Sequence, residues 1–121
     1  MKKLLIAFDV DGTLVKNDGQ PNGRILANER VRRMLIDLAH SKNVKILVWS
    51  GGGELWARQA AKEIGVAPYV DLYADKVYIK CTKCTEPCNH HEFGTKIQPD
   101  IAFDDIQECV LGKVNIIVRE K

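Results

Sequence analysis

The sequence lacks a recognisable membrane-spanning segment and a recognisable signal peptide. No apolar run approaches the roughly 20 residues that a membrane-spanning helix needs. Lys2 and Lys3 precede a short apolar run, but this run stops at Asp9 and has no small-residue cleavage site after it, which argues against a signal peptide. We therefore expect a cytoplasmic protein that has no membrane partner.

The chain also lacks a strong charge of either sign, since its formal net charge is +2. This total gives no indication of a basic face for nucleic acid or of an acidic tail. Arg30, Arg32 and Arg33 are close together, but no aromatic residues interleave with them. We interpret these arginines as the solvated face of a helix.

The length of 121 residues allows one hydrophobic core and not two. We therefore predict a single domain over residues 1–121. In a cytoplasmic protein the four cysteines would be reduced, metal-bound or reactive, and would not form disulfides.

Two carboxylates close to the N-terminus follow an apolar run over residues 4–8, which is typical of a buried strand. Asp9 and Asp11 are two residues apart, and alternate residues of an extended segment point to the same side. Two neighbouring acids repel each other unless a cation lies between them, and Mg²⁺ suits a site of few carboxylates. Gly12 allows a sharp turn, and Thr13 offers a hydroxyl and a backbone N–H to an anion.

Strand and helix patterns alternate along the rest of the chain, which predicts an α/β fold with a parallel sheet flanked by helices. Strands are expected over 44–49, 101–103 and 114–118, with a further approach to a strand over 68–74. Helices are expected from Glu29, after a capping Asn28, to about 41–43, and over 54–64. Ligands bind beyond the carboxyl ends of such strands. Asp9, Asp11, Ser50 and Asp104 are all expected at such ends.

Ser50 ends the second predicted strand and is followed by three glycines and a helix. The backbone N–H groups of such a turn and of the helix N-terminus can bind a phosphate. Ser50 and Gly51 are therefore candidate phosphate ligands. The fourth predicted strand runs into Asp104 and Asp105, a second acidic pair at a strand end.

These motifs resemble those of the haloacid dehalogenase (HAD) superfamily. Its first motif, Asp-x-Asp-Gly-Thr, is matched in full by Asp9, Asp11, Gly12 and Thr13. Ser50 resembles the second motif, and Asp104 with Asp105 resembles the fourth. The third motif is a lysine, for which Lys76 is the best candidate by position, and Lys80 and Lys96 are alternatives.

The resemblance implies a Rossmann-like HAD core and an Mg²⁺-dependent phosphomonoester hydrolase that forms an aspartyl-phosphate. Asp9 would be the nucleophile, and Asp11 the general acid and base. Ser50 and Lys76 would stabilise the transferring group, with Gly12, Thr13 and Gly51 also at the substrate. Asp9, the backbone carbonyl of Asp11 and Asp104 would hold Mg²⁺.

A chain of this length has no room for the cap domain of larger HAD enzymes. An open site suits a large substrate such as a nucleic-acid end or a phosphoprotein, whereas a small phosphorylated molecule would need a neighbouring subunit of a homo-oligomer to cover it. The alternative to an enzyme is a zinc-stabilised binding or regulatory module with little turnover, because fold does not guarantee function.

The insert at about 81–91 holds Cys81, Cys84 and Cys88, followed by His90 and His91. This spacing matches a Cys₃His zinc site in which either histidine is the fourth ligand. A closed set of four ligands has no open position, so we expect structural Zn²⁺. A redox cysteine pair and metal-free reduced cysteines are the alternatives. Cys109 lies apart from this cluster and is expected to be a buried apolar residue.

Overall fold

A computed structural model of the chain describes residues 3–16, 25–80, 91–94, 97–105 and 112–119. In these ranges the elements are β1 (Leu4–Asp9), α1 (Glu29–Ala39), β2 (Val44–Ser50), α2 (Glu54–Glu63), η1 (Ala67–Tyr69, a 3₁₀ turn), β3 (Leu72–Asp75), β4 (Val77–Lys80), β5 (His91–Gly94), β6 (Ile101–Asp104) and β7 (Val114–Ile117). Neither helix of the described ranges has the length and apolar character needed to cross a membrane.

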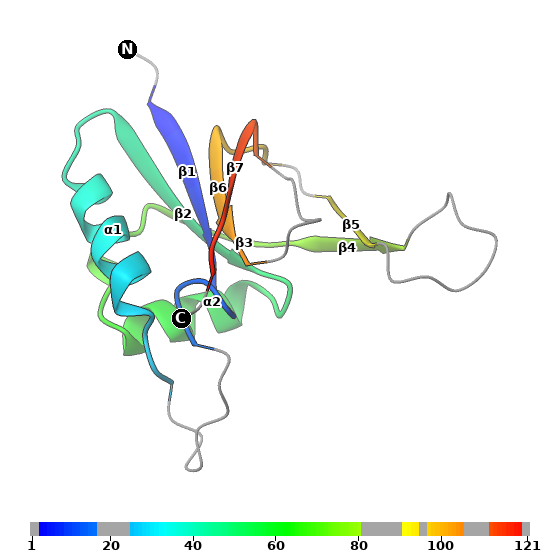
Figure 1. Cartoon of the computed structure of the whole chain (residues 1–121), viewed down its shortest axis with the longest axis horizontal. Helices are drawn as coiled ribbons and strands as arrows, with labels where there is room; N and C mark the ends of the chain where they lie inside the picture. The colour runs from blue at the N-terminus through cyan, green and yellow to red at the C-terminus, as the bar shows by residue number, and fades with distance from the viewer. Residues whose placement is uncertain (1–2, 17–24, 81–90, 95–96, 106–111, 120–121) are drawn as a thin grey trace.

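The main sheet has five strands in the order β3-β2-β1-β6-β7, and every neighbouring pair is parallel (Figure 1). The predicted α/β fold with a parallel sheet is therefore confirmed. The chain moves outward from β1 through β2 to β3 and then continues on the other side of β1 with β6 and β7. This change of direction lies between β1 and β6, and such a switch point is where ligands bind in open parallel sheets.

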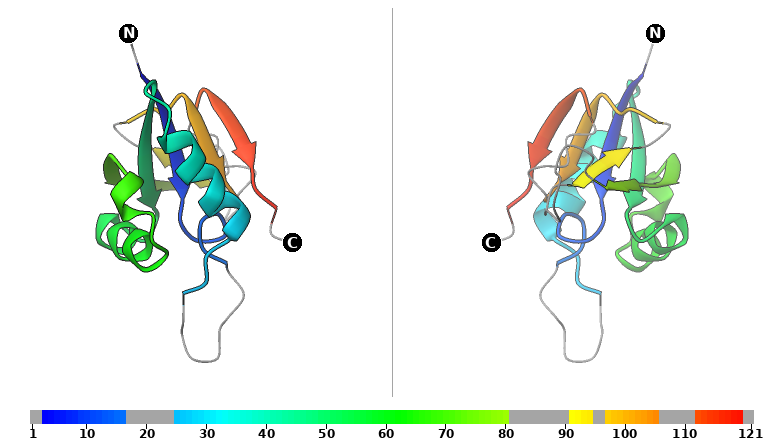
Figure 2. Two further views of the ribbon diagram at one scale, coloured as in Figure 1. Left: turned by 90° about the vertical axis from the view of Figure 1, so that its left-hand side faces the viewer. Right: turned by 90° about the vertical axis from the view of Figure 1, so that its right-hand side faces the viewer.

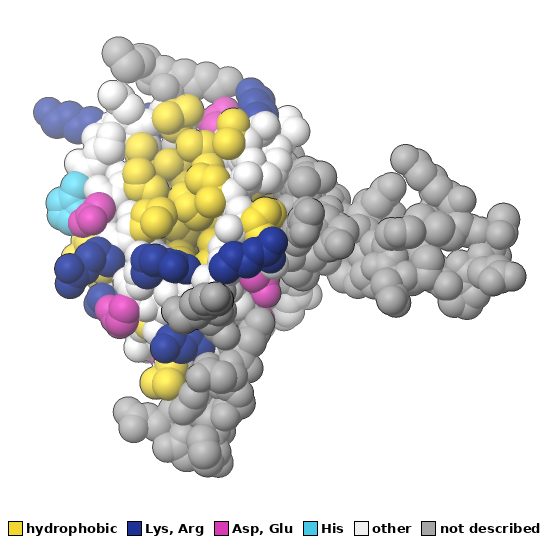
Figure 3. Space-filling model, viewed as in Figure 1, with side chains coloured by type: hydrophobic (Ala, Val, Ile, Leu, Met, Phe, Trp, Pro, Cys, Tyr) yellow, Lys and Arg dark blue, Asp and Glu magenta, His cyan; other side chains and the backbone are white. Residues whose placement is uncertain are grey.

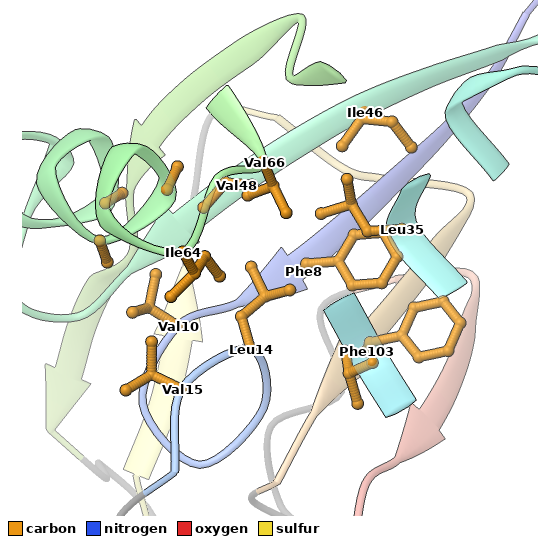
Figure 4. Close-up of a cluster of buried hydrophobic side chains, with 14 of the residues drawn as sticks. Phe8, Val10, Leu14, Val15, Leu35, Ile46, Val48, Ile64, Val66 and Phe103 are labelled. Atoms are coloured by element: carbon orange, nitrogen blue, oxygen red, sulfur yellow. The ribbon is translucent and has the colours of Figure 1, made fainter. Parts of the chain in front are cut away.

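Both helices pack against one face of the sheet, where alternate strand residues form the larger core. Phe8 of β1 and Phe103 of β6 stack with their ring centroids 4.7 Å apart. Leu35 of α1 and Ala57 of α2 belong to the same buried cluster. Figure 4 shows Phe8, Phe103 and Leu35 together, with Val10 from the loop after β1 extending the cluster. Long apolar side chains at these positions explain why the strands are recognisable from the sequence.

The other face of the sheet carries a smaller core and a separate two-stranded ribbon. Ala7, Leu47, Trp49 and Ala102 are buried there. The ribbon pairs β4 with β5 in antiparallel fashion, and Lys80 lies opposite His91 at its end. Figure 2 shows α1 in front of the sheet from one side and the ribbon in front of it from the opposite side.

Most predicted boundaries lie within a few residues of the observed ones, but three details differ. Helix α1 begins after Asn28 as predicted, although the Asn28 side chain makes no capping hydrogen bond and the residue is buried instead. The helix ends at Ala39, earlier than predicted, because the backbone N–H of His40 bonds to Asp37 in a tighter turn. Strand β5 was not predicted, since no apolar alternation marks it.

An apolar patch lies on the helix-bearing face between α1 and β7, with basic side chains along one border (Figure 3). It includes a shallow pocket of about 310 Å³. The pocket is lined by Arg30, Val31, Met34, Phe103, Ile116, Ile117, Val118 and Arg119. None of the acidic strand-end residues lines this pocket, so it is separate from the site described below.

Gly112, which leads into β7, should not tolerate a side chain. A Cβ atom there would lie 2.8 Å from the carbonyl oxygen of Val114 and 2.9 Å from the backbone nitrogen of Ala102. We expect Gly112→Ala to lower the free energy of unfolding by about 1–3 kcal/mol through overpacking. Urea denaturation measures this effect. Gly51→Ala is the matched control, because its Cβ would meet nothing within 4 Å; equal losses in both variants would contradict the prediction.

Candidate active site

Asp9 is the last residue of β1, and the loop after it is held tightly by its own backbone. The N–H groups of Thr13 and Val15 donate to the carbonyl of Val10, and that of Leu14 donates to the carbonyl of Asp9. Val10, Leu14 and Val15 point into the core (Figure 4). Gly12 has a φ of +83°, which a residue with a side chain rarely adopts. The buried side chains of Val10, Leu14 and Val15 therefore fix the loop at the carboxyl end of β1.

The Asp9 carboxylate is buried, and both of its oxygens accept hydrogen bonds. The Nζ of Lys76 lies 2.7 Å from Oδ1, and the Thr13 hydroxyl donates to Oδ2 at 3.2 Å. Lys76 Nζ also lies 2.5 Å from Oδ2 of Asp104. The ends of β1, β3 and β6 thus place one ammonium group between two carboxylates. Strands β1 and β6 are neighbours in the sheet, and β3 is separated from β1 by β2.

Of the three candidate lysines, Lys76 is the one whose side chain the structure describes, and it lies beside both acids. Its backbone N–H donates to the Ser50 carbonyl at 3.1 Å, which extends the pairing of β3 with β2 by one residue. The Lys76 side chain is 3 % exposed, so it is held among the strand ends and not on the surface. The side chain of Lys80 and all of Lys96 lie outside the described residues.

Burial and charge shift the acid–base properties of this cluster. Burial raises the pKa of Asp9 to about 7; the Lys76 ammonium opposes this shift, and the Asp104 charge adds to it. Burial also raises the pKa of Asp105. For Lys76, burial acts to lower the pKa, but the two carboxylates outweigh burial and hold the pKa above its usual value. Asp9 and Asp105 are thus both shifted toward their protonated forms, and Lys76 toward its charged form.

Three acids of this cluster lie close enough together that they could hold a metal ion. One carboxylate oxygen each from Asp9, Asp104 and Asp105 lies within 4.8 Å of the others. Oxygen ligands of this kind are those that Mg²⁺ prefers. The carboxylate of Asp11 was expected to face the same site, but it does not belong to this group of three acids. The ligand set implied by the motif used the backbone carbonyl of Asp11, not its side chain.

Asp11 lies in a different environment from Asp9, although the two were expected to face one site. Its side chain is exposed, and Oδ2 accepts a hydrogen bond from Nε1 of Trp56 at 3.0 Å. Trp56 was not recognised in the sequence, because only the packing of α2 brings it to the loop after β1. One acid is thus buried beside a lysine, and the other is held at the surface by an indole.

Thr13 and the turn after Ser50 differ from the expected anion cradle. Thr13 is fully buried, and its hydroxyl orients Asp9 and not an anion. The Gly52 N–H donates to the Ser50 hydroxyl oxygen at 3.0 Å, and the Glu54 N–H donates to a carboxylate oxygen of Asp75. The N-terminus of α2 is therefore already partly satisfied within the protein. Ser50 is buried, and its O–H remains a donor while its oxygen accepts from the Gly52 N–H.

The predicted zinc ligands cannot be located. Cys81, Cys84, Cys88 and His90 lie outside the described residues, as does Cys109, and His91 is described only in its backbone as the first residue of β5. The β4–β5 ribbon pairs residue 80 with residue 91 and so brings together the two ends of this insert.

The raised pKa of Asp9 predicts how its charge affects stability with pH in a metal-free buffer. Because the folded-state pKa is about 7 and the unfolded value is near 3.9, folding favours the protonated acid, and this contribution is lost as pH rises from about 4 to 7. Asparagine resembles the protonated form, so Asp9→Asn should gain stability relative to the wild type over that range. Urea denaturation at pH 4.5 and pH 7 with a chelator measures the change, and a constant difference would refute it.

Comparison of the chain with models of protein families, with curated proteins and with solved structures gives no match.

Proposed function

We propose that this chain is a phosphomonoester hydrolase with the HAD-type core that its motifs resemble, and that it acts through an aspartyl-phosphate. The observation that carries this proposal is the meeting of Asp9, Lys76 and Asp104 at the carboxyl ends of parallel strands, beside the switch point of the sheet. A buried carboxylate, a lysine and a cation site are the parts that nucleophilic phosphoryl transfer requires.

Asp9 is the proposed nucleophile, because hydrogen bonds to both of its oxygens fix the carboxylate. One of these oxygens attacks phosphorus, the P–O bond to the alcohol breaks, and Asp11 gives a proton to the departing alcohol. Water then attacks the phosphorus of the aspartyl-phosphate, and Asp11 takes a proton from that water. The P–O bond to Asp9 breaks, which releases phosphate and restores the carboxylate.

Asp9 and Asp104 are the proposed Mg²⁺ ligands, with the Asp11 backbone carbonyl as expected from the motif and Asp105 as a further candidate. Mg²⁺ bound there supplies positive charge that favours ionised Asp9 and offsets the charge of a phosphate. Lys76, held beside Asp9, provides a second positive charge. The Ser50 hydroxyl is the proposed donor to a phosphate oxygen, with the backbone of Gly51 beside it.

The proposed substrate is a phosphorylated small molecule or a phosphorylated nucleic-acid end. Asp11, the proposed acid for the leaving group, is exposed, and a bulky alcohol can therefore approach it. In the proposed core, which has no cap domain, a small substrate would be enclosed by a second copy of the chain. We place the reaction in the cytoplasm, in line with the sequence.

The decisive experiment is Mg²⁺-dependent release of phosphate from a panel of esters that includes an aryl phosphate, alkyl phosphates and a 3′-phosphorylated oligonucleotide. We expect Asp9→Asn to lower the rate by at least about 10³-fold, because it removes the attacking oxygen anion. Asp37→Asn is the matched control, an exposed acid on α1 that should retain full activity.

Activity that survives in Asp9→Asn would refute the aspartyl-phosphate mechanism. A folded wild-type protein that releases no phosphate from any ester would instead favour the zinc-stabilised binding or regulatory module.

We also propose that the insert at 81–91 binds one structural Zn²⁺ through Cys81, Cys84, Cys88 and His90 or His91. Metal analysis of the purified protein should give about one zinc per chain. Cys84→Ser should lose this zinc, because serine is a poor zinc ligand, whereas Cys109→Ser should retain it. Zinc that stays bound in Cys84→Ser, or leaves with Cys109→Ser, would contradict this ligand set.

A further inference from the structure

We propose that Trp56 is a positioning residue for Asp11, an inference that rests on the proposed hydrolase function. Its indole Nε1–H donates to Oδ2 of Asp11 at 3.0 Å across 45 residues of sequence. None of the motifs that suggested the function includes this tryptophan. It links helix α2 directly to the side chain that has to move protons in both steps of the reaction.

The position of Trp56 is fixed from two sides. It is the third residue of α2, and the Asp75 carboxylate bonds to the N–H of Glu54 at the start of that helix. Its ring also packs over Gly52: a Cβ added at Gly52 would lie 3.3 Å from Cδ1 of Trp56 and 3.4 Å from the Ser50 hydroxyl oxygen. The ring and the Ser50 hydroxyl therefore flank the same glycine, and the indole holds the Asp11 carboxylate on the side of the proposed phosphate site.

The chemistry of the indole suits this role. An exposed aspartate normally exchanges among rotamers, and ordering it for a reaction has an entropic cost. The indole N–H can donate a hydrogen bond, but it cannot accept one and does not ionise in this pH range. It can thus hold Oδ2 of Asp11 without competing for the transferred proton, and Oδ1 is left to give and take that proton.

Formation of the aspartyl-phosphate needs Asp11 as an acid, and its hydrolysis needs Asp11 as a base. Esters with different leaving groups can therefore test the two roles separately. An aryl phosphate has a leaving group that departs without a proton, so only hydrolysis of the aspartyl-phosphate needs Asp11. An alkyl phosphate needs Asp11 in both steps. Trp56→Phe keeps a ring over Gly52 but removes the N–H. Leu55→Ala is the matched control, because Leu55 lies beside Trp56 on the same helical turn and is 81 % exposed.

For the aryl ester we expect Trp56→Phe to lower kcat about tenfold, the effect of losing a hydrogen bond to a charged group. KM should fall with kcat, so that kcat/KM is unchanged, and acid-quenched samples should contain more phosphorylated protein than the wild type. For the alkyl ester we expect kcat/KM to fall about tenfold as well. Leu55→Ala should behave as the wild type with both esters.

Wild-type kinetics in Trp56→Phe would overturn the inference. So would equal losses of kcat/KM with the two esters, which indicate general damage to the site. Neither result would affect the hydrolase function itself, which is tested separately by an active wild type and an inactive Asp9→Asn variant. A folded wild type that hydrolyses neither ester refutes the hydrolase function, and the role of Trp56 with it.

Discussion

The rest of this site depends on the buried ion pairs that the ammonium group of Lys76 forms with Asp9 and Asp104. Asp9 and Asp104 are both almost fully buried, and two carboxylates so placed would repel each other across a medium of low dielectric constant. Lys76 lies within hydrogen-bonding distance of both. It therefore joins the ends of β1, β3 and β6 through charge, in addition to the backbone pairing of the sheet. A neutral residue at this position would leave two buried acids with less compensation.

The two acids of the Asp-x-Asp pair illustrate how one short motif yields two chemical environments. Asp9 belongs to the strand, where burial raises its pKa to about 7 and Lys76 and Thr13 orient it. Asp11 belongs to the loop, where it is exposed and bonded to Trp56. The intervening Val10 is buried in the core, which separates the two carboxylates. The sequence motif suggests two equivalent ligands, but in the structure Asp9 is a fixed carboxylate and Asp11 is an accessible one.

Much of the fold could be predicted from the sequence, because buried parallel strands are continuous apolar runs and the acids follow directly at their ends. Asp9, Ser50 and Asp104 are predictable for this reason. The sequence could not decide between Lys76, Lys80 and Lys96. Lys76 and Lys80 both follow β-rich segments, Lys96 precedes the fourth predicted strand, and the choice depends on the packing of these segments. Trp56 and the burial of Thr13 could not be predicted either, because helix packing and the tight loop determine them and leave no local pattern.

The order of strands in the sheet has a consequence for how the chain folds. Lys76 meets Asp9 across 67 residues and Asp104 across 28, so the site consists of long-range contacts. Proteins rich in such contacts fold more slowly than those with local ones, because each long loop must close before its contacts form. During synthesis on the ribosome Asp9 emerges first, Lys76 follows 67 residues later, and Asp104 is the last of the three to leave the exit tunnel. The ammonium group of Lys76 is thus available to Asp9 before the second carboxylate is synthesised.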